Sequence, residues 1–119
     1  MILAFDTYYF DNQAKTVAVQ FKNWTENTVE QVYEETLSGI NEYVSGEFYK
    51  RELPCILSLL KQIDLSICEA IIIDGFVYLN DENKKGLGAY LYEALQEKIA
   101  IIGLGYVGLP LARLFATKY

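Results

Sequence analysis

A run of branched apolar residues at positions 70–74 (Ala-Ile-Ile-Ile-Asp) limits the folds open to this chain more than any other feature. Because three isoleucines follow one another without alternation, the run is typical of a strand that is buried on both faces. Such a strand lies inside a sheet against which helices pack. The run therefore predicts an α/β fold in which Asp74 marks the end of an inner strand.

The segments around this strand predict the rest of the sheet and its helices. Residues 2–10 and 15–21 are rich in β-forming residues and flank a turn at 11–13, which predicts a hairpin over residues 2–21. Residues 28–36 predict either a third strand or a short acidic helix. Helices are expected over 53–63, with Pro54 in the first turn, over 87–97 and over 106–118, and a second buried strand over 98–102. This order predicts one mixed α/β domain over residues 1–119.

The composition narrows the class of protein and its chemistry. With 119 residues, 52% of them hydrophobic, the chain can bury a core of its own. No apolar run reaches the roughly 18 residues of a membrane span, and Asp6 interrupts the N-terminus before a signal-peptide core could form. We therefore expect a cytoplasmic protein with no membrane partner, in which Cys55 and Cys68 are reduced core residues.

The chain has no histidine, which excludes Ser-His-Asp and Cys-His nucleophiles and the usual zinc sites. Any catalysis must therefore use carboxylates. The net charge of −6 argues against broad electrostatic capture of nucleic acid. Bound divalent cations would, however, supply positive charge at a local site.

Three acidic residues are candidates for such a site. Asp6 lies within an apolar strand, where an acid is costly unless a metal or a partner compensates it. Asp74 ends the isoleucine strand at the edge where open α/β sheets place their ligands, and Glu52 opens the helix between the two strands. Mg²⁺ needs only two or three carboxylates brought together. The alternative is structural, with Asp74 capping a turn and Glu52 placed by the helix dipole.

The same acids are part of a wider pattern. Residues 42–54 (Glu-Tyr-Val-Ser-Gly-Glu-Phe-Tyr-Lys-Arg-Glu-Leu-Pro), with Asp6 before them and Asp74-Gly75 after them, resemble the motifs of endonuclease V. The resemblance covers about residues 1–103. It implies a ribonuclease H-like mixed sheet with an N-terminal antiparallel hairpin, and it favours the strand over residues 28–36. Because no counterpart of the family's C-terminal third follows, it also implies a truncated domain with reduced activity.

The resemblance to endonuclease V implies a chemistry for the acids. Asp6, Glu52 and Asp74 match the family's three catalytic acids, which would bind Mg²⁺ or Mn²⁺. The metal would generate a hydroxide and stabilise the leaving oxygen during phosphodiester hydrolysis. The implied substrate is inosine-containing DNA or RNA, cut near the deaminated base.

The resemblance also implies contacts to the substrate. Tyr43 matches the aromatic residue that wedges into the nucleic acid beside the lesion. Gly46 and Gly75 match positions where the backbone approaches the extruded base. Arg51 matches the arginine that precedes the second acid.

The C-terminal segment, residues 98–119, carries a second motif. Gly103, Gly105 and Gly108 form a G-x-G-x-x-G pattern between a predicted strand and a predicted helix. The segment resembles the start of nucleotide-sugar dehydrogenases of the UDP-glucose type, which implies contact with the phosphates of NAD. The acid expected about 20 residues further on would fall beyond Tyr119. We therefore expect no useful NAD binding, only a strand and a covering helix. A nucleotide-binding fragment and a non-catalytic scaffold remain alternatives, and the oligomeric state is left open.

Overall fold

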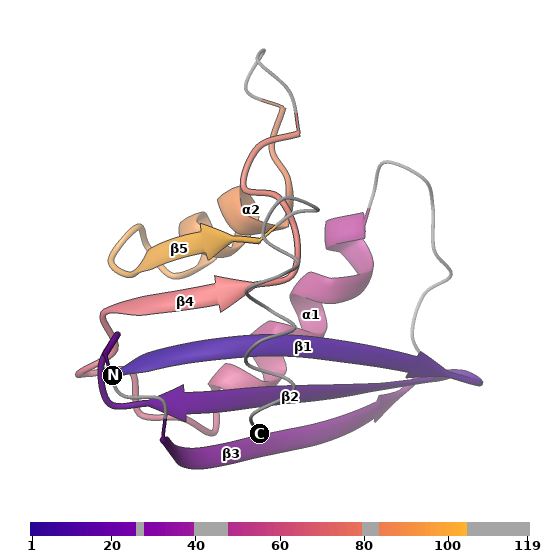
Figure 1. Ribbon diagram of the computed structural model, residues 1–119. Helices are drawn as coiled ribbons and strands as arrows, with labels where there is room; N and C mark the ends of the chain where they lie inside the picture. The colour runs from indigo at the N-terminus through magenta and orange to yellow at the C-terminus, as the bar shows by residue number, and fades with distance from the viewer. Residues whose placement is uncertain (26–27, 40–47, 80–83, 105–119) are drawn as a thin grey trace.

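The computed structural model describes residues 1–25, 28–39, 48–79 and 84–104, which form five strands and two helices (Figure 1). The strands are β1 (Ile2–Phe10), β2 (Gln13–Phe21), β3 (Val29–Ser38), β4 (Ala70–Ile73) and β5 (Ala100–Gly103), and the helices are α1 (Phe48–Leu60) and α2 (Leu87–Ala94). The strands form one sheet in the order β3-β2-β1-β4-β5. β1, β2 and β3 pair antiparallel, whereas β4 and β5 run parallel to β1. The predicted mixed α/β sheet with an N-terminal hairpin is confirmed.

The hairpin has a two-residue connection, because Phe10 pairs with Gln13. Asp11 adopts φ of +53°, a left-handed conformation that aspartate tolerates in tight turns. The structure also decides between the strand and the short acidic helix predicted for residues 28–36. Residues in this region form β3, an edge strand paired with β2 over its whole length.

The isoleucine strand is buried on both faces, as its sequence predicts. Every residue of β4 is buried. Ile71 and Ile73 pack with the two helices in the larger apolar cluster, whereas Ile72 belongs to a smaller cluster on the other face with Ile2 and Phe21. Figure 1 shows α1 and α2 together behind the sheet, on one of its faces.

Helix α1 begins five residues earlier than its apolar periodicity indicated and ends at Leu60. Pro54 is therefore in the middle of the helix, and its expected place in the first turn was wrong. Proline lacks the N–H that would bond to the carbonyl of Lys50, and its ring lies on the exposed side of the helix. Three tight turns follow the helix, with backbone bonds from Lys61, Gln62 and Ile63 to residues three positions earlier.

The C-terminal part of the described chain differs from the prediction at its boundaries. Helix α2 ends at Ala94, short of the predicted end near Glu97, because Gln96 and Glu97 take φ of +61° and +58°. Strand β5 begins at Ala100, two residues later than predicted. Its predicted burial was wrong, because β5 is an edge strand whose residues alternate between exposed and half-buried. The helix predicted over 106–118 lies outside the described residues. Neither described helix is long and apolar enough to cross a membrane.

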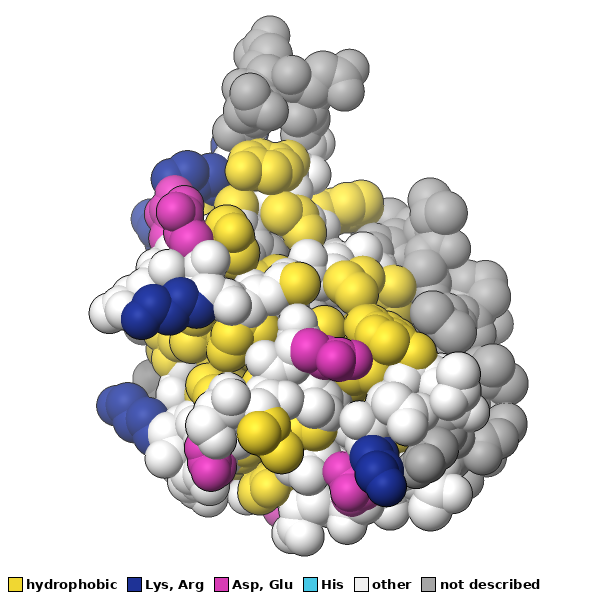
Figure 2. Space-filling model, turned by 90° about the vertical axis from the view of Figure 1, so that its left-hand side faces the viewer, with side chains coloured by type: hydrophobic (Ala, Val, Ile, Leu, Met, Phe, Trp, Pro, Cys, Tyr) yellow, Lys and Arg dark blue, Asp and Glu magenta, His cyan; other side chains and the backbone are white. Residues whose placement is uncertain are grey.

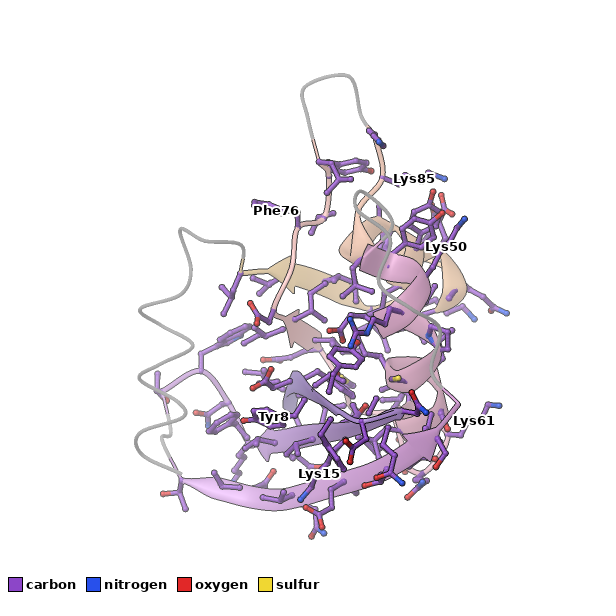
Figure 3. All side chains as sticks on the ribbon, turned by 90° about the vertical axis from the view of Figure 1, so that its right-hand side faces the viewer. Tyr8, Lys15, Lys50, Lys61, Phe76 and Lys85 are labelled. Atoms are coloured by element: carbon purple, nitrogen blue, oxygen red, sulfur yellow. The ribbon has the colours of Figure 1, made fainter. Side chains whose placement is uncertain are left out.

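The two ends of the sheet differ in character. Figure 2 looks at the end where β4 and β5 begin, and there hydrophobic side chains reach the surface among only scattered charged groups. Ile67, which precedes β4, is one of the exposed apolar residues. Strand β4 ends at the opposite end of the sheet, which Figure 3 faces, and Asp74 directly follows it.

Candidate carboxylate site

The site forms where two neighbouring strands stop pairing. Strand β1 pairs with β4 in parallel from Ile2 opposite Ala70 to Ala4 opposite Ile72. Strand β4 then ends at Ile73, while β1 continues for several residues to Phe10. Asp6 lies on β1 just beyond the paired stretch, and Asp74 directly follows β4. The carboxyl edge of β4 therefore brings these two acids next to each other, as parallel register requires.

Glu52 reaches the same place from helix α1. Asp6, Glu52 and Asp74 line one small pocket that is partly open to solvent. The other lining residues are Phe5, Thr7, Ile56, Ile73 and Leu87. The three acids that the sequence singled out thus share a pocket, whereas their assignment as metal ligands remains a prediction.

The acids approach this pocket from two sides of the sheet. Side chains alternate along a strand, and the neighbour of Asp6, Phe5, packs with the helices. Asp6 is therefore in phase with Ile2, which belongs to the cluster on the other face. Glu52 comes from α1, on the helix-covered face. Asp6 and Glu52 can line the same pocket because β4 ends at Ile73. Beyond that point no strand covers this edge of β1 and separates the two faces of the sheet.

The oxygen donors suit a hard divalent cation such as Mg²⁺, which is often bound by one or two carboxylates and several waters. In the part of the chain that the structure describes, no three Asp, Glu, His or Cys side chains are grouped closely enough to hold a metal ion. The three carboxylates therefore form a shared pocket with suitable ligand chemistry, but not a closed three-ligand cage.

Glu52 is the most unusual of the acids, because only 7% of its surface is exposed. Burial raises the pKa of its carboxyl group, and the charges of Asp6 and Asp74 raise it further. The hydroxyls of Thr7 and Tyr9 lie near enough to lower this pKa, although neither makes a hydrogen bond of standard geometry. Burial and the two neighbouring carboxylates therefore outweigh the two hydroxyls and disfavour the charged form of Glu52.

The pKa of Asp74 is shifted in the same direction. Burial raises the pKa of its carboxyl group, and the nearby Asp6 carboxylate adds to the effect. Both influences favour the protonated acid and would be reversed by a cation in the pocket. The alternative in which the helix dipole alone explains Glu52 is weakened, because Glu52 is the fifth residue of α1 rather than one of its first.

Arg51 does not line the pocket. Its guanidinium carbon lies 3.4 Å from the centre of the Tyr9 ring, which is a cation–π contact between α1 and β1. Burial and the Glu52 charge both raise the pKa of the Tyr9 hydroxyl. Tyr9 and Thr7 were missed in the sequence analysis, although strict alternation from Phe5 places both on the helix-covered face.

The remaining predicted site residues are glycines and Tyr43. Tyr43, Gly46, Gly105 and Gly108 lie outside the described residues, so their predicted roles are untested. Gly75 directly follows Asp74 and begins the segment that leaves the sheet.

Gly103, the last residue of β5, has a structural explanation of its own. A Cβ atom on Gly103 would lie 2.5 Å from the carbonyl oxygen of Gly75 and 3.0 Å from the amide nitrogen of Val77. Contacts this short exclude any side chain unless the backbone moves. Gly103 is therefore needed to let β5 pack beside the segment that follows Asp74, whether or not a nucleotide binds.

Comparison with solved structures identifies the fold. The catalytic domain of human endonuclease V aligns with a TM-score of 0.67 and 20% identity, over 80% of this chain and 41% of that one. Endonuclease V from Bacillus subtilis aligns with a TM-score of 0.59 and 21% identity, over 76% of this chain and 38% of that one. No protein-family model and no curated protein sequence matches the chain. The chain thus spans about two fifths of the length of these structures, and over most of its own length it has the fold of an endonuclease V catalytic domain.

Proposed function

We propose that this protein is a metal-dependent endonuclease that hydrolyses phosphodiester bonds at the pocket of Asp6, Glu52 and Asp74. The observation that supports this most directly is the burial of Glu52 beside two further carboxylates on an endonuclease V fold. A buried carboxylate beside two further carboxylates is costly in a purely structural role. A cation between the carboxylates removes that cost.

In this proposal the carboxylates of Asp6 and Asp74 hold the cation at the exposed mouth of the pocket, and the Glu52 carboxylate lies on its helix side. A bound Mg²⁺ or Mn²⁺ would supply a hydroxide nucleophile and stabilise charge on the leaving oxygen. Thr7 and Tyr9 orient Glu52 through their hydroxyls, which lie close to its carboxyl group. Phe5, Ile56 and Leu87 form the apolar wall that limits water in the pocket.

The proposed substrate is DNA or RNA that contains a deaminated purine such as inosine. This follows from the endonuclease V resemblance of residues 42–54, which assigns Tyr43 as a wedge and Gly46 and Gly75 as neighbours of the extruded base. Arg51, held against Tyr9 beside Glu52, acts in this proposal by fixing the start of α1 rather than by touching the substrate.

Cleavage of labelled strands tests the proposal. We expect 5′-labelled DNA and RNA strands with one central inosine to be cut in MgCl₂ and to remain intact in EDTA. Asp6→Asn, Glu52→Gln and Asp74→Asn should each lower the rate by about 100-fold or more. Asp64→Asn is the matched control, since Asp64 is exposed and accepts a hydrogen bond from the Ser66 amide outside the pocket.

The control should retain the parent rate within about twofold, because asparagine can accept the same hydrogen bond. Metal-independent cleavage by the parent, or equal rates in the parent and the three pocket variants, would contradict the proposal. Circular dichroism of each variant separates a lost carboxylate from a lost fold.

A further inference from the structure

The face of the sheet that points away from the two helices carries apolar residues of its own. Figure 1 shows α1 and α2 together on one face of the sheet. On the other face, Ile2, Phe21 and Ile72 form the smaller of the two apolar clusters in the described core. The two helices therefore leave the hydrophobic residues of this second face uncovered.

The strand register arranges these residues in two rows that cross the whole sheet. Each row takes one residue from each strand, in the order from β3 to β5. The first row is Val29, Phe21, Ile2, Ala70 and Ala100. The second row is Val32, Val19, Ala4, Ile72 and Ile102. Every residue in both rows is apolar, and we call the two rows together the outer apolar band.

The outer apolar band stops where polar residues begin. On the same face, the next row toward the carboxylate pocket contains Glu34, Val17 and Asp6. Lys15, in the row after that, forms an ion pair of 3.5 Å with Glu34. The band is therefore a bounded apolar strip beside a polar region. A surface of this kind is typical of a contact with another element.

The second row of the band is exposed at both of its ends. Val32, on edge strand β3, is 49% exposed, and Ile102, on edge strand β5, is 37% exposed. Removing apolar side chains from water is favourable. The band therefore favours an apolar cover that reaches from one edge of the sheet to the other.

The described chain ends beside this band. Leu104 packs against the cluster of Ile2, Phe21 and Ile72. Its amide donates a hydrogen bond of 2.9 Å to the carbonyl of Ile73, at the end of β4. The residues that follow Leu104 therefore begin on the uncovered face, at the β5 end of the band.

The length and pattern of those residues match the band. Residues 105–119 include Val107, Leu111, Leu114 and Phe115, which recur at helical spacing. The helix predicted over 106–118 would be about 20 Å long. The band spans the four gaps between five strands, or about 19 Å. A helix of this length would reach from β5 to β3.

We propose that residues 105–119 fold back across the outer apolar band as an amphipathic helix, with Leu111, Leu114 and Phe115 against the sheet. Gly105 directly follows Leu104, and glycine permits the sharp turn that this path requires. Because the segment is tethered beside the band, its effective concentration there is high. The segment that resembles the start of a dehydrogenase thus serves as a cover for this sheet. The inference does not depend on the proposed nuclease function.

Limited proteolysis of the full chain tests the cover. Trypsin cleaves after Arg113, and intact mass spectrometry follows the appearance of the fragment 1–113. A short helix free in solution is mostly unfolded and is therefore cut readily. We expect Arg113 to be cut at least about 10-fold more slowly in the full chain than in the synthetic peptide 105–119. Protein concentrations about 100-fold apart should give the same protection, because the contact lies within one chain.

Variants of the band assign the protection to this face. Val32→Glu and Ile102→Glu each place a charge at an exposed end of the band and should bring the cleavage rate to within about threefold of the peptide rate. Phe115→Ala should raise the rate about fivefold or more. Gln31→Glu is the matched control, because Gln31 is exposed next to Val32 and its side chain lies on the other face. The control should be cut like the parent, and circular dichroism should show the parent fold in every variant.

Cleavage of the full chain at the peptide rate would overturn the inference. Protection that increases with protein concentration would overturn it too, since a second copy would then cover the band. Unchanged protection in Val32→Glu and Ile102→Glu would show that the segment docks elsewhere. An equal loss of protection in Gln31→Glu would refute the assignment as well, because added charge alone would then explain the effect.

Discussion

Replacing Glu52 by glutamine tests the electrostatic account of the pocket without relying on catalysis. Glu52 is buried, and burial together with Asp6 and Asp74 raises the pKa of its carboxyl group above the ordinary value of 4.5. Glutamine has nearly the same shape and keeps an acceptor oxygen near the hydroxyls of Thr7 and Tyr9. The substitution thus removes the charge and preserves the packing.

The sign of the effect follows from the raised pKa. Because the folded protein holds the Glu52 proton more tightly than the unfolded chain, this group stabilises the fold fully below pH 4.5. That contribution is lost as the pH rises through the raised pKa, so at pH 7 without metal the carboxylate is a net cost. A tenfold difference in proton affinity between the folded and unfolded chain is equivalent to about 1.4 kcal/mol. We expect Glu52→Gln to raise the free energy of unfolding at pH 7 by about 1–3 kcal/mol.

Thermal unfolding in EDTA measures this gain. For a domain of this size, 1 kcal/mol is equivalent to a change in Tm of about 4–8 °C. The variant should melt higher than the parent at pH 7, and the difference should shrink as the pH falls through the raised pKa of Glu52, because the parent's carboxyl then takes up a proton. Glu69→Gln, at an exposed position, is the control and should melt like the parent. A variant that melts below the parent at pH 7 would refute the reasoning, because it would show that the protein already compensates the charge.

The remaining predictions concern the sheet that carries the site. Ile71→Ala should destabilise the fold by about 3–5 kcal/mol in urea unfolding, because Ile71 is fully buried in the inner strand. Ile67→Ala, at an exposed residue, should change stability by less than about 0.5 kcal/mol, and equal effects of the two would contradict the burial pattern. Gly103→Ala should cost about 1–3 kcal/mol, because its Cβ would lie 2.5 Å from the Gly75 carbonyl oxygen. An unchanged urea midpoint in Gly103→Ala would show that β5 does not pack so closely there.

The sheet could be predicted because its signals are local. The unbroken isoleucine run at 71–73 has few alternatives to an inner strand, and the turn at Asp11 fixes the hairpin by itself. The end of α2 could not be predicted in the same way. Gln96 and Glu97 are ordinary helix-forming residues, and only their left-handed conformation in the folded chain ends the helix.

The burial of Glu52 was within reach of sequence analysis but was missed. The buried residues of α1 and the turn after it are spaced as one helical face, at positions 52, 55, 56, 59, 60 and 63. The predicted helix began at residue 53, so Glu52 was assigned to the helix start and not to this buried face. With the helix begun at Phe48, the same periodicity places the carboxylate on the apolar side.

The position of Asp6 depends on a feature that no local pattern carries. Strand alternation alone puts Asp6 on the face away from α1, and so separates it from Glu52. The two reach one pocket because β4 has four residues and β1 has nine, so the sheet ends on one side of Asp6 and continues on the other. If β4 continued through Gly75, its next residues would pair with β1 and close the opening. The early end of β4 therefore opens the pocket that the three acids share.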